Sequence, residues 1–227
     1  MSEPLDRQAW VDTVIADPPP VHPEKPTGVV WRTQTSCYRF IADQVGRGSR
    51  TLETGAGLST VLFAAWGCDH LAVVPFPDEA VAVEAYCDSH GIDRTTLRFD
   101  LRPSEVALPT LVGDRELDLV FVDGCHGYPM PVVDWFYGAG MLRSGGVLVL
   151  DDLQLPQVRN LVDTFLDSDP RWERLRATDK WIAFRRTTSG PLAEMESEQA
   201  FFPLPPRSVA DRIKAAVPPK LVGLVKR

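Results

Sequence analysis

The chain has 227 residues, of which 44% are hydrophobic, and it carries a formal net charge of −7 with a pI near 5.1. This length and composition predict one domain with a buried core and terminal appendages, rather than two full domains. The acidic balance argues against a nucleic acid partner, because proteins that bind phosphate backbones present a basic field. Every apolar run is shorter than the roughly 18 residues of a membrane span, and the N-terminus lacks a signal-peptide pattern, so a cytoplasmic protein without a membrane span is expected.

Proline dominates the region before the predicted domain. Residues 17–28, DPPPVHPEKPTG, hold five prolines, which fix φ and disfavour helix. Residues 1–35 are therefore interpreted as an N-terminal arm or lid, and SCYRFIADQVG after them as a short helix. The four cysteines, Cys37, Cys68, Cys87 and Cys125, form no Cys-x-x-Cys pair and are predicted to be reduced and buried.

From Arg50 onward, short β-rich apolar runs alternate with helical stretches. Strands are predicted at 51–54, 70–74, 95–99, 117–122 and 146–150, and helices at about 58–67, 78–90, 104–112, 129–142 and 155–168. The runs LDLVFVD and GGVLVLDD are apolar on both faces, as strands of a parallel sheet covered by helices on both sides must be. The runs RWERLRAT and KWIAFRRT are joined by too few residues for a crossover helix, so they must pair antiparallel.

The stretch LETGAGLST lies where the first strand meets the first helix of this series. Glycine at this point lets a ligand approach the backbone, and the free amides of the helix start can bind polar groups. The loop lacks the third glycine of a dinucleotide fingerprint, which weakens the case for a nicotinamide oxidoreductase. A tight turn without a ligand is the alternative.

This stretch resembles the first motif of class I S-adenosylmethionine-dependent methyltransferases, where an acidic residue precedes a G-x-G loop. The resemblance covers residues 36–187 and implies an α/β fold: a Rossmann-like, doubly wound, seven-stranded sheet, mostly parallel with an antiparallel last strand. It also implies S-adenosylmethionine as cofactor, bound by Glu53, Gly55, Ala56, Gly57, Ser59, Asp100, Ser104 and Asp123. In one respect the chain departs from the family, because Pro75 stands where an acid usually binds the ribose, with Asp78 and Glu79 a few residues later.

Three carboxylates follow two predicted strands: Asp123 ends the fourth, and Asp151 and Asp152 end the fifth. Adjacent strands bring them to one rim of the sheet, where like charges raise a pKa or attract a hard divalent cation such as Mg²⁺. The set resembles the metal site of O-methyltransferases of the catechol and macrolide-sugar type, which implies that Asp123, Asp151 and Asp152 bind the metal. A polar rim of helix-capping acids is the alternative.

His126 lies three residues after Asp123 and is the candidate general base, with a hydrogen-bonded loop residue as the alternative. Asp123, His126 and Asp151 are thus the predicted catalytic residues. Tyr128 and Trp31 are candidate walls of the substrate site, whereas Trp135, Phe136 and Tyr137 fall on a predicted helix and are expected to pack in the core.

Residues 188–227 are interpreted as a proline-rich arm followed by a basic amphipathic tail, in which residues 207–227 hold six basic residues and one acidic residue. The tail fits docking on the domain, on a second copy in a homo-oligomer, or on an anionic membrane surface. The leading hypothesis is methyl transfer from S-adenosylmethionine to an oxygen of a small-molecule acceptor, with Mg²⁺ as assisting ion. The alternatives are a metal-independent enzyme with His126 as base and a Rossmann-like binding protein without catalysis.

Overall fold

The computed structural model of the chain describes residues 6–21, 32–113, 116–189 and 192. Trp31 and the predicted basic tail lie outside these residues, as does nearly all of the arm before the tail. The helices are α1 (Arg7–Ala16), α2 (Thr35–Gln44), α3 (Leu58–Ala65), α4 (Pro77–Ser89), α5 (Ser104–Leu111), α6 (Met130–Met141) and α7 (Pro156–Leu161), which continues as a π-helical turn, Val162–Leu166. The strands are β1 (Arg50–Thr54), β2 (Asp69–Val73), β3 (Leu97–Asp100), β4 (Leu117–Val122), β5 (Leu142–Leu150), β6 (Trp172–Ala177) and β7 (Ile182–Arg186).

The seven strands form one sheet in the order β3-β2-β1-β4-β5-β7-β6. Strands β1 to β5 pair in parallel, and β7 lies antiparallel to both β5 and β6. The predicted mostly parallel, seven-stranded sheet with a reversed end is therefore confirmed. Strand order reverses between β1 and β4, and in an open α/β sheet the ligand site lies beyond the carboxyl ends of the strands at that point.

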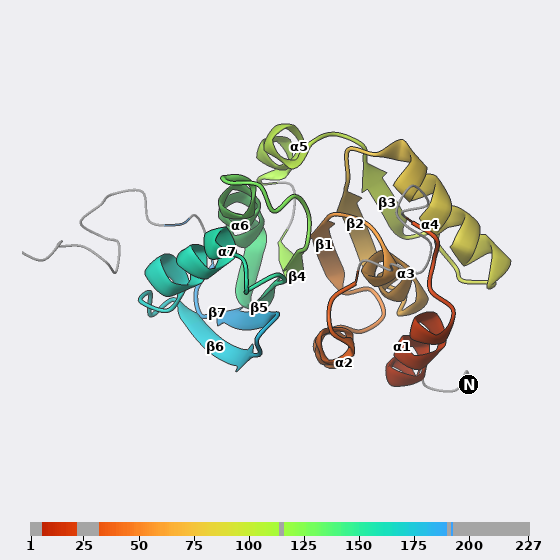
Figure 1. Ribbon diagram of the computed structural model, residues 1–227, viewed down its shortest axis with the longest axis horizontal. Coiled ribbons are helices and arrows are strands. Elements are labelled where there is room, and N and C mark those ends of the chain that lie inside the picture. The colour runs from red at the N-terminus through yellow and green to blue at the C-terminus, as the bar shows by residue number, and fades with distance from the viewer. Residues whose placement is uncertain (1–5, 22–31, 114–115, 190–191, 193–227) are drawn as a thin grey trace, which may run out of the picture. The chain divides into compact units, whose positions relative to one another are not determined.

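Each face of the sheet is covered by its own set of helices (Figure 1). Buried side chains of α1 to α4 pack with Leu119 and Phe121 of β4 on one face. Buried side chains of α5, α6 and α7 pack with Val120 and Val122 on the other. Successive side chains of a strand point to opposite faces of the sheet, so the continuous apolar run of β4 contributes to the core on both faces.

The first helix was not predicted from the sequence. Asp6 caps α1 by accepting hydrogen bonds from the backbone N–H groups of Gln8 and Ala9, each at 3.0 Å. Val11 and Val14 are fully buried in the cluster that also contains residues of α2 and α3. Part of the region interpreted as an arm thus packs on the domain.

Three of the four cysteines are buried and all four are free. Cys125 is exposed, so the prediction of burial is wrong for this residue: it lies in the loop after β4 rather than in an element. None of the described helices is both long and apolar enough to cross a membrane.

Candidate functional site

The glycine loop joins β1 to α3 at the switch in strand order. Gly55 has φ +95°, and a Cβ built on it would lie 2.6 Å from the backbone oxygen of Asp123. Only glycine allows this close approach between the ends of β1 and β4. Gly57 has an extended backbone at φ 171°, and no atom lies within 4 Å of the position that its Cβ would occupy. Open space therefore lies above the second glycine but not above the first.

Glu53 supports this loop from inside the protein. Its side chain is 1% exposed, and its Oε1 accepts a short hydrogen bond from the Thr60 hydroxyl and lies 3.1 Å from His70 Nε2. The Thr60 hydroxyl also accepts a 2.8 Å hydrogen bond from the backbone N–H of Gly57. His70 is held in turn by Thr51 Oγ1, 2.7 Å from its Nδ1. The predicted cofactor residue Glu53 is thus bonded to the protein's own groups, and these bonds fix the loop.

The residues predicted near the adenine and ribose lie at the ends of β2 and β3. Asp100, the last residue of β3, accepts hydrogen bonds from Arg102 Nε at 2.8 Å and Nη2 at 2.6 Å, and these hold the pKa of its carboxyl below the usual range. Ser104 begins α5 and is buried. At the end of β2, Pro75 is followed by Phe76, whose side chain is 59% exposed. Of the two acids that follow, Asp78 is exposed and Glu79 is half-buried, and both lie in the first turn of α4 rather than at the end of β2.

The three predicted rim carboxylates lie where β4 and β5 end side by side. Val122 and Leu150 are register partners, so Asp123 and Asp151 follow directly on neighbouring strands. Asp151 is buried: its Oδ1 accepts a 2.5 Å hydrogen bond from the Thr33 hydroxyl, and its Oδ2 lies 3.2 Å from Lys180 Nζ. Both oxygens of Asp151 are thus engaged by the protein.

Asp152 has the left-handed φ of 54°, which Asp tolerates better than most residues. Its Oδ1 accepts hydrogen bonds from Lys180 Nζ and, at 2.7 Å, from Gln154 Nε2. Its Oδ2 lies 2.7 Å from His126 Nε2, although the ring N–H is not aligned with this oxygen as a hydrogen bond. The close imidazole of His126, with Lys180 and Gln154, lowers the pKa of Asp152, which is therefore ionised at neutral pH.

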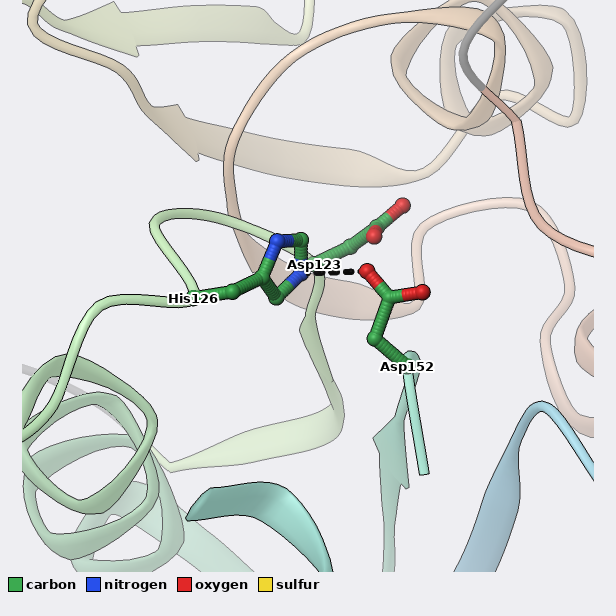
Figure 2. A group of neighbouring side chains, drawn as sticks. All are labelled: Asp123, His126 and Asp152. Atoms are coloured by element: carbon green, nitrogen blue, oxygen red, sulfur yellow. Dashed lines mark ion pairs between the residues drawn. The ribbon is translucent and has the colours of Figure 1, made fainter. Parts of the chain in front are cut away.

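Asp123 has the opposite electrostatic environment. Desolvation, followed by the carboxylates of Asp151 and Asp152, raises its pKa well above the usual range. Figure 2 shows the Asp123 and Asp152 side chains and the His126 ring lying close together above the ends of β4 and β5. One ligand atom from each of the three lies within 4.8 Å of the others. The group with metal-site spacing is therefore Asp123, His126 and Asp152, with His126 in the place expected for Asp151.

Three contributors to the site were missed in the sequence. Thr33 and Lys180 reach the rim from before α2 and from the turn between β6 and β7, far from Asp151 along the chain. Asp134 of α6 is 1% exposed, and burial raises its pKa to about 6 despite the nearby hydroxyls of Ser104 and Thr54. An Asp within the otherwise apolar run MPVVDWF is the sequence signal that could have identified it.

The aromatic residues divide as the pattern predicts, with one exception. Trp135 and Tyr137 pack against the core cluster of the α6 face, whereas Phe136 is 49% exposed. Tyr128 is 78% exposed in the loop after β4, and its predicted role as a wall of the substrate site stays a prediction.

Residues 52–153 match the family model described as a methyltransferase domain. Among solved structures, the chain is similar to the O-methyltransferase TomG from Streptomyces achromogenes, involved in tomaymycin synthesis and solved with SAM: 18% identity, 82% of this chain, 91% of that chain, TM-score 0.57. It is also similar to an O-methyltransferase from Bacillus cereus solved with SAH, at 14% identity over 78% of this chain and 91% of that chain, TM-score 0.57. An rRNA methylase from Streptococcus thermophilus matches at 14% identity over 71% of this chain and 100% of that chain, TM-score 0.53. None of the curated proteins matches significantly.

At these identities the likeness to solved structures shows the fold alone. The predicted resemblance to methyltransferases is confirmed over residues 52–153, and the Rossmann-like sheet has the reversed last hairpin that this resemblance implies.

Proposed function

We propose that the chain transfers the methyl group of S-adenosylmethionine to an oxygen of a small molecule, with His126 as general base. The observation that carries the proposal is the 2.7 Å approach of His126 Nε2 to the ionised carboxylate of Asp152. His126 lies three residues after Asp123, whose backbone oxygen lies against Gly55 of the glycine loop.

The glycine loop fits the cofactor. The space above Gly57 and the amides that begin α3 offer a ligand both room and hydrogen-bond donors. The ribose side fits less closely, because Pro75 replaces the usual acid and the exposed ring of Phe76 offers only an apolar surface. We expect ribose binding to depend on backbone groups or water.

His126 is positioned for proton transfer by contacts on two sides. Its carbonyl oxygen accepts a hydrogen bond from Gln157 of α7, and its Nε2 faces the Asp152 carboxylate. With Nε2 facing the carboxylate, the other ring nitrogen, Nδ1, is left to accept a proton. When bound, S-adenosylmethionine would supply an electrophilic sulfonium methyl group for the acceptor oxygen, with S-adenosylhomocysteine as the leaving group, and His126 would take the proton of the acceptor hydroxyl.

The acceptor is proposed to be a small molecule with a hydroxyl or carboxyl group. Two of the structural relatives are O-methyltransferases, which supports oxygen as the acceptor atom, while the rRNA methylase shows that the fold also serves RNA. The net charge of −7 favours the small molecule. The exposed Tyr128 is the proposed wall of its site.

A metal-assisted reaction is the second candidate, favoured by the ligand-atom spacing of Asp123, His126 and Asp152. The distances among these three residues suit a divalent cation, although Lys180 already pairs with Asp152; Asp151 fits poorly because Thr33 and Lys180 engage both of its oxygens. A cation held there would stabilise the developing oxyanion of the acceptor. In that case His126 is a ligand and not the base.

Titration with S-adenosylhomocysteine tests the core of the proposal, and absence of binding at near-millimolar ligand would reject it. Transfer from radiolabelled cofactor to a panel of phenols, sugars and carboxylic acids then tests the acceptor class, with amines and RNA as competing panels. His126→Gln should lower kcat by about 10²- to 10⁴-fold with an unchanged KM for the cofactor. His90→Gln, at the end of α4, is the matched control. Activity that survives excess EDTA favours the metal-independent reaction, and loss restored by Mg²⁺ or Mn²⁺ favours the second candidate.

A further inference from the structure

The acidic pair after β5 already contacts a cation that belongs to the protein. Lys180 Nζ forms a salt bridge with Asp152 Oδ1 and lies 3.2 Å from Asp151 Oδ2. One ammonium group thus joins two of the three carboxylates that the family resemblance assigns to a divalent ion. The ammonium reaches them from the turn between β6 and β7, on the antiparallel end of the sheet.

This lysine is held in place by its backbone on both sides. Its carbonyl oxygen accepts a 2.7 Å hydrogen bond from Leu153 N–H, the residue directly after the acidic pair. The Thr178 hydroxyl accepts hydrogen bonds from the N–H groups of Lys180, at 3.2 Å, and Trp181, at 2.9 Å. Asp179 of the same turn accepts a 2.9 Å bond from Gln34. These bonds fix the turn, so the ammonium group of Lys180 lies at the acidic pair without a ligand to place it there.

The charges agree with a permanent cation at this position. Lys180 Nζ lies against a carboxylate oxygen of each acid, so its positive charge is compensated at that position and the lysine stays charged at neutral pH.

We propose that Lys180 is a built-in cation of the acidic rim, which neutralises Asp151 and Asp152 and excludes a divalent ion from this pair. Asp151 is then not a metal ligand: one of its oxygens accepts the hydrogen bond from Thr33, and the other holds the ammonium group of Lys180. This inference deepens the proposed function, because a rim with its own cation leaves His126 free to act as base. The exclusion of metal does not itself require the chain to bind S-adenosylmethionine.

The experiment is a metal titration of the full chain without cofactor. Mn²⁺ is the probe, followed by electron paramagnetic resonance of the free ion, with Mg²⁺ as competitor. The variants are Lys180→Met and Lys180→Gln, which remove the charge, and Lys180→Arg, which keeps it. Arg185→Met is the matched control, since it removes one positive charge from β7 that pairs with Glu173 outside the rim.

We expect Mn²⁺ to bind Lys180→Met and Lys180→Gln at least about tenfold more tightly than the wild-type chain, because a like charge a few ångströms away is removed. Lys180→Arg and Arg185→Met should bind as the wild type does. If a charge-removing variant is unstable, Mn²⁺ should raise its Tm without raising that of the wild type. Equal affinities for wild type and both charge-removing variants, whether tight or absent, would overturn the proposal. Failure to bind S-adenosylhomocysteine would reject the proposed function and leave this result unaffected.

Discussion

The two loop glycines differ in their surroundings, so alanine at each should have a different effect. At Gly55 the new Cβ meets the Asp123 carbonyl at 2.6 Å, and φ is +95°. The positive φ costs an L-residue about 1–2 kcal/mol, and a contact with backbone that cannot rotate away adds roughly 1–3 kcal/mol. We expect Gly55→Ala to lower the free energy of unfolding by about 2–5 kcal/mol.

At Gly57 the backbone is extended and the Cβ position is open, so Gly57→Ala should fold with an unchanged or slightly higher Tm. The new methyl group projects into the space proposed for the cofactor. Its affinity for S-adenosylhomocysteine should therefore fall by about tenfold or more, since that loss corresponds to about 1.4 kcal/mol.

Thermal unfolding and calorimetric titration, carried out on both variants, separate the two effects. In a domain of this size, about 1 kcal/mol corresponds to roughly 2–4 °C in Tm. Gly46→Ala is the control, because its Cβ position is also open and it lies outside the glycine loop. A Gly55→Ala variant that melts with the wild type, or a Gly57→Ala variant that binds the ligand as tightly as the wild type, would refute this account of the loop.

Three further predictions concern buried polar groups. Thr60→Val removes the hydroxyl that links the glycine loop to Glu53, so it should weaken S-adenosylhomocysteine binding about tenfold. Thr60→Ser keeps the hydroxyl and should bind as the wild type does; equal titration curves for the two variants would contradict this. Burial raises the pKa of Asp134 to about 6 in the folded state, so the free energy of unfolding is highest below about pH 4 and falls as the pH rises through 6. In urea unfolding at pH 7.5, the Asp134→Asn variant should therefore have a higher free energy of unfolding than the wild type, by at most about 3 kcal/mol, with no such gain at pH 4. Tyr86→Phe loses a 2.5 Å hydrogen bond to the Asp17 carbonyl and should cost about 1 kcal/mol in thermal unfolding; an unchanged Tm would count against it.

The arrangement of the sheet follows from the sequence because its causes are local. Runs such as LDLVFVD are apolar on both faces, and the short link between RWERLRAT and KWIAFRRT excludes a parallel crossover. Helix α1 does not follow in the same way, because only Val11 and Val14 of its ten residues are buried and the apolar pattern is weak. Strand β3 begins at Leu97, two residues after its predicted start at Thr95.

The partners within the rim could not be predicted in the same way. Strand ends place Asp123 beside Asp151, and that much follows from topology. Whether Asp151 is available for a metal depends on its contacts with Thr33 and Lys180. Thr33 lies 118 positions before Asp151 in the sequence, and Lys180 lies in the turn after β6. Such contacts depend on how separate segments pack, and no spacing in the sequence encodes them.

The contact between Gly55 and the Asp123 carbonyl links two loops with different tasks. If the cofactor binds at the first loop as proposed, it would also restrict the second loop, which carries His126. We therefore expect ordered binding, in which S-adenosylmethionine binds first and the acceptor binds after the loop that carries His126 has been fixed.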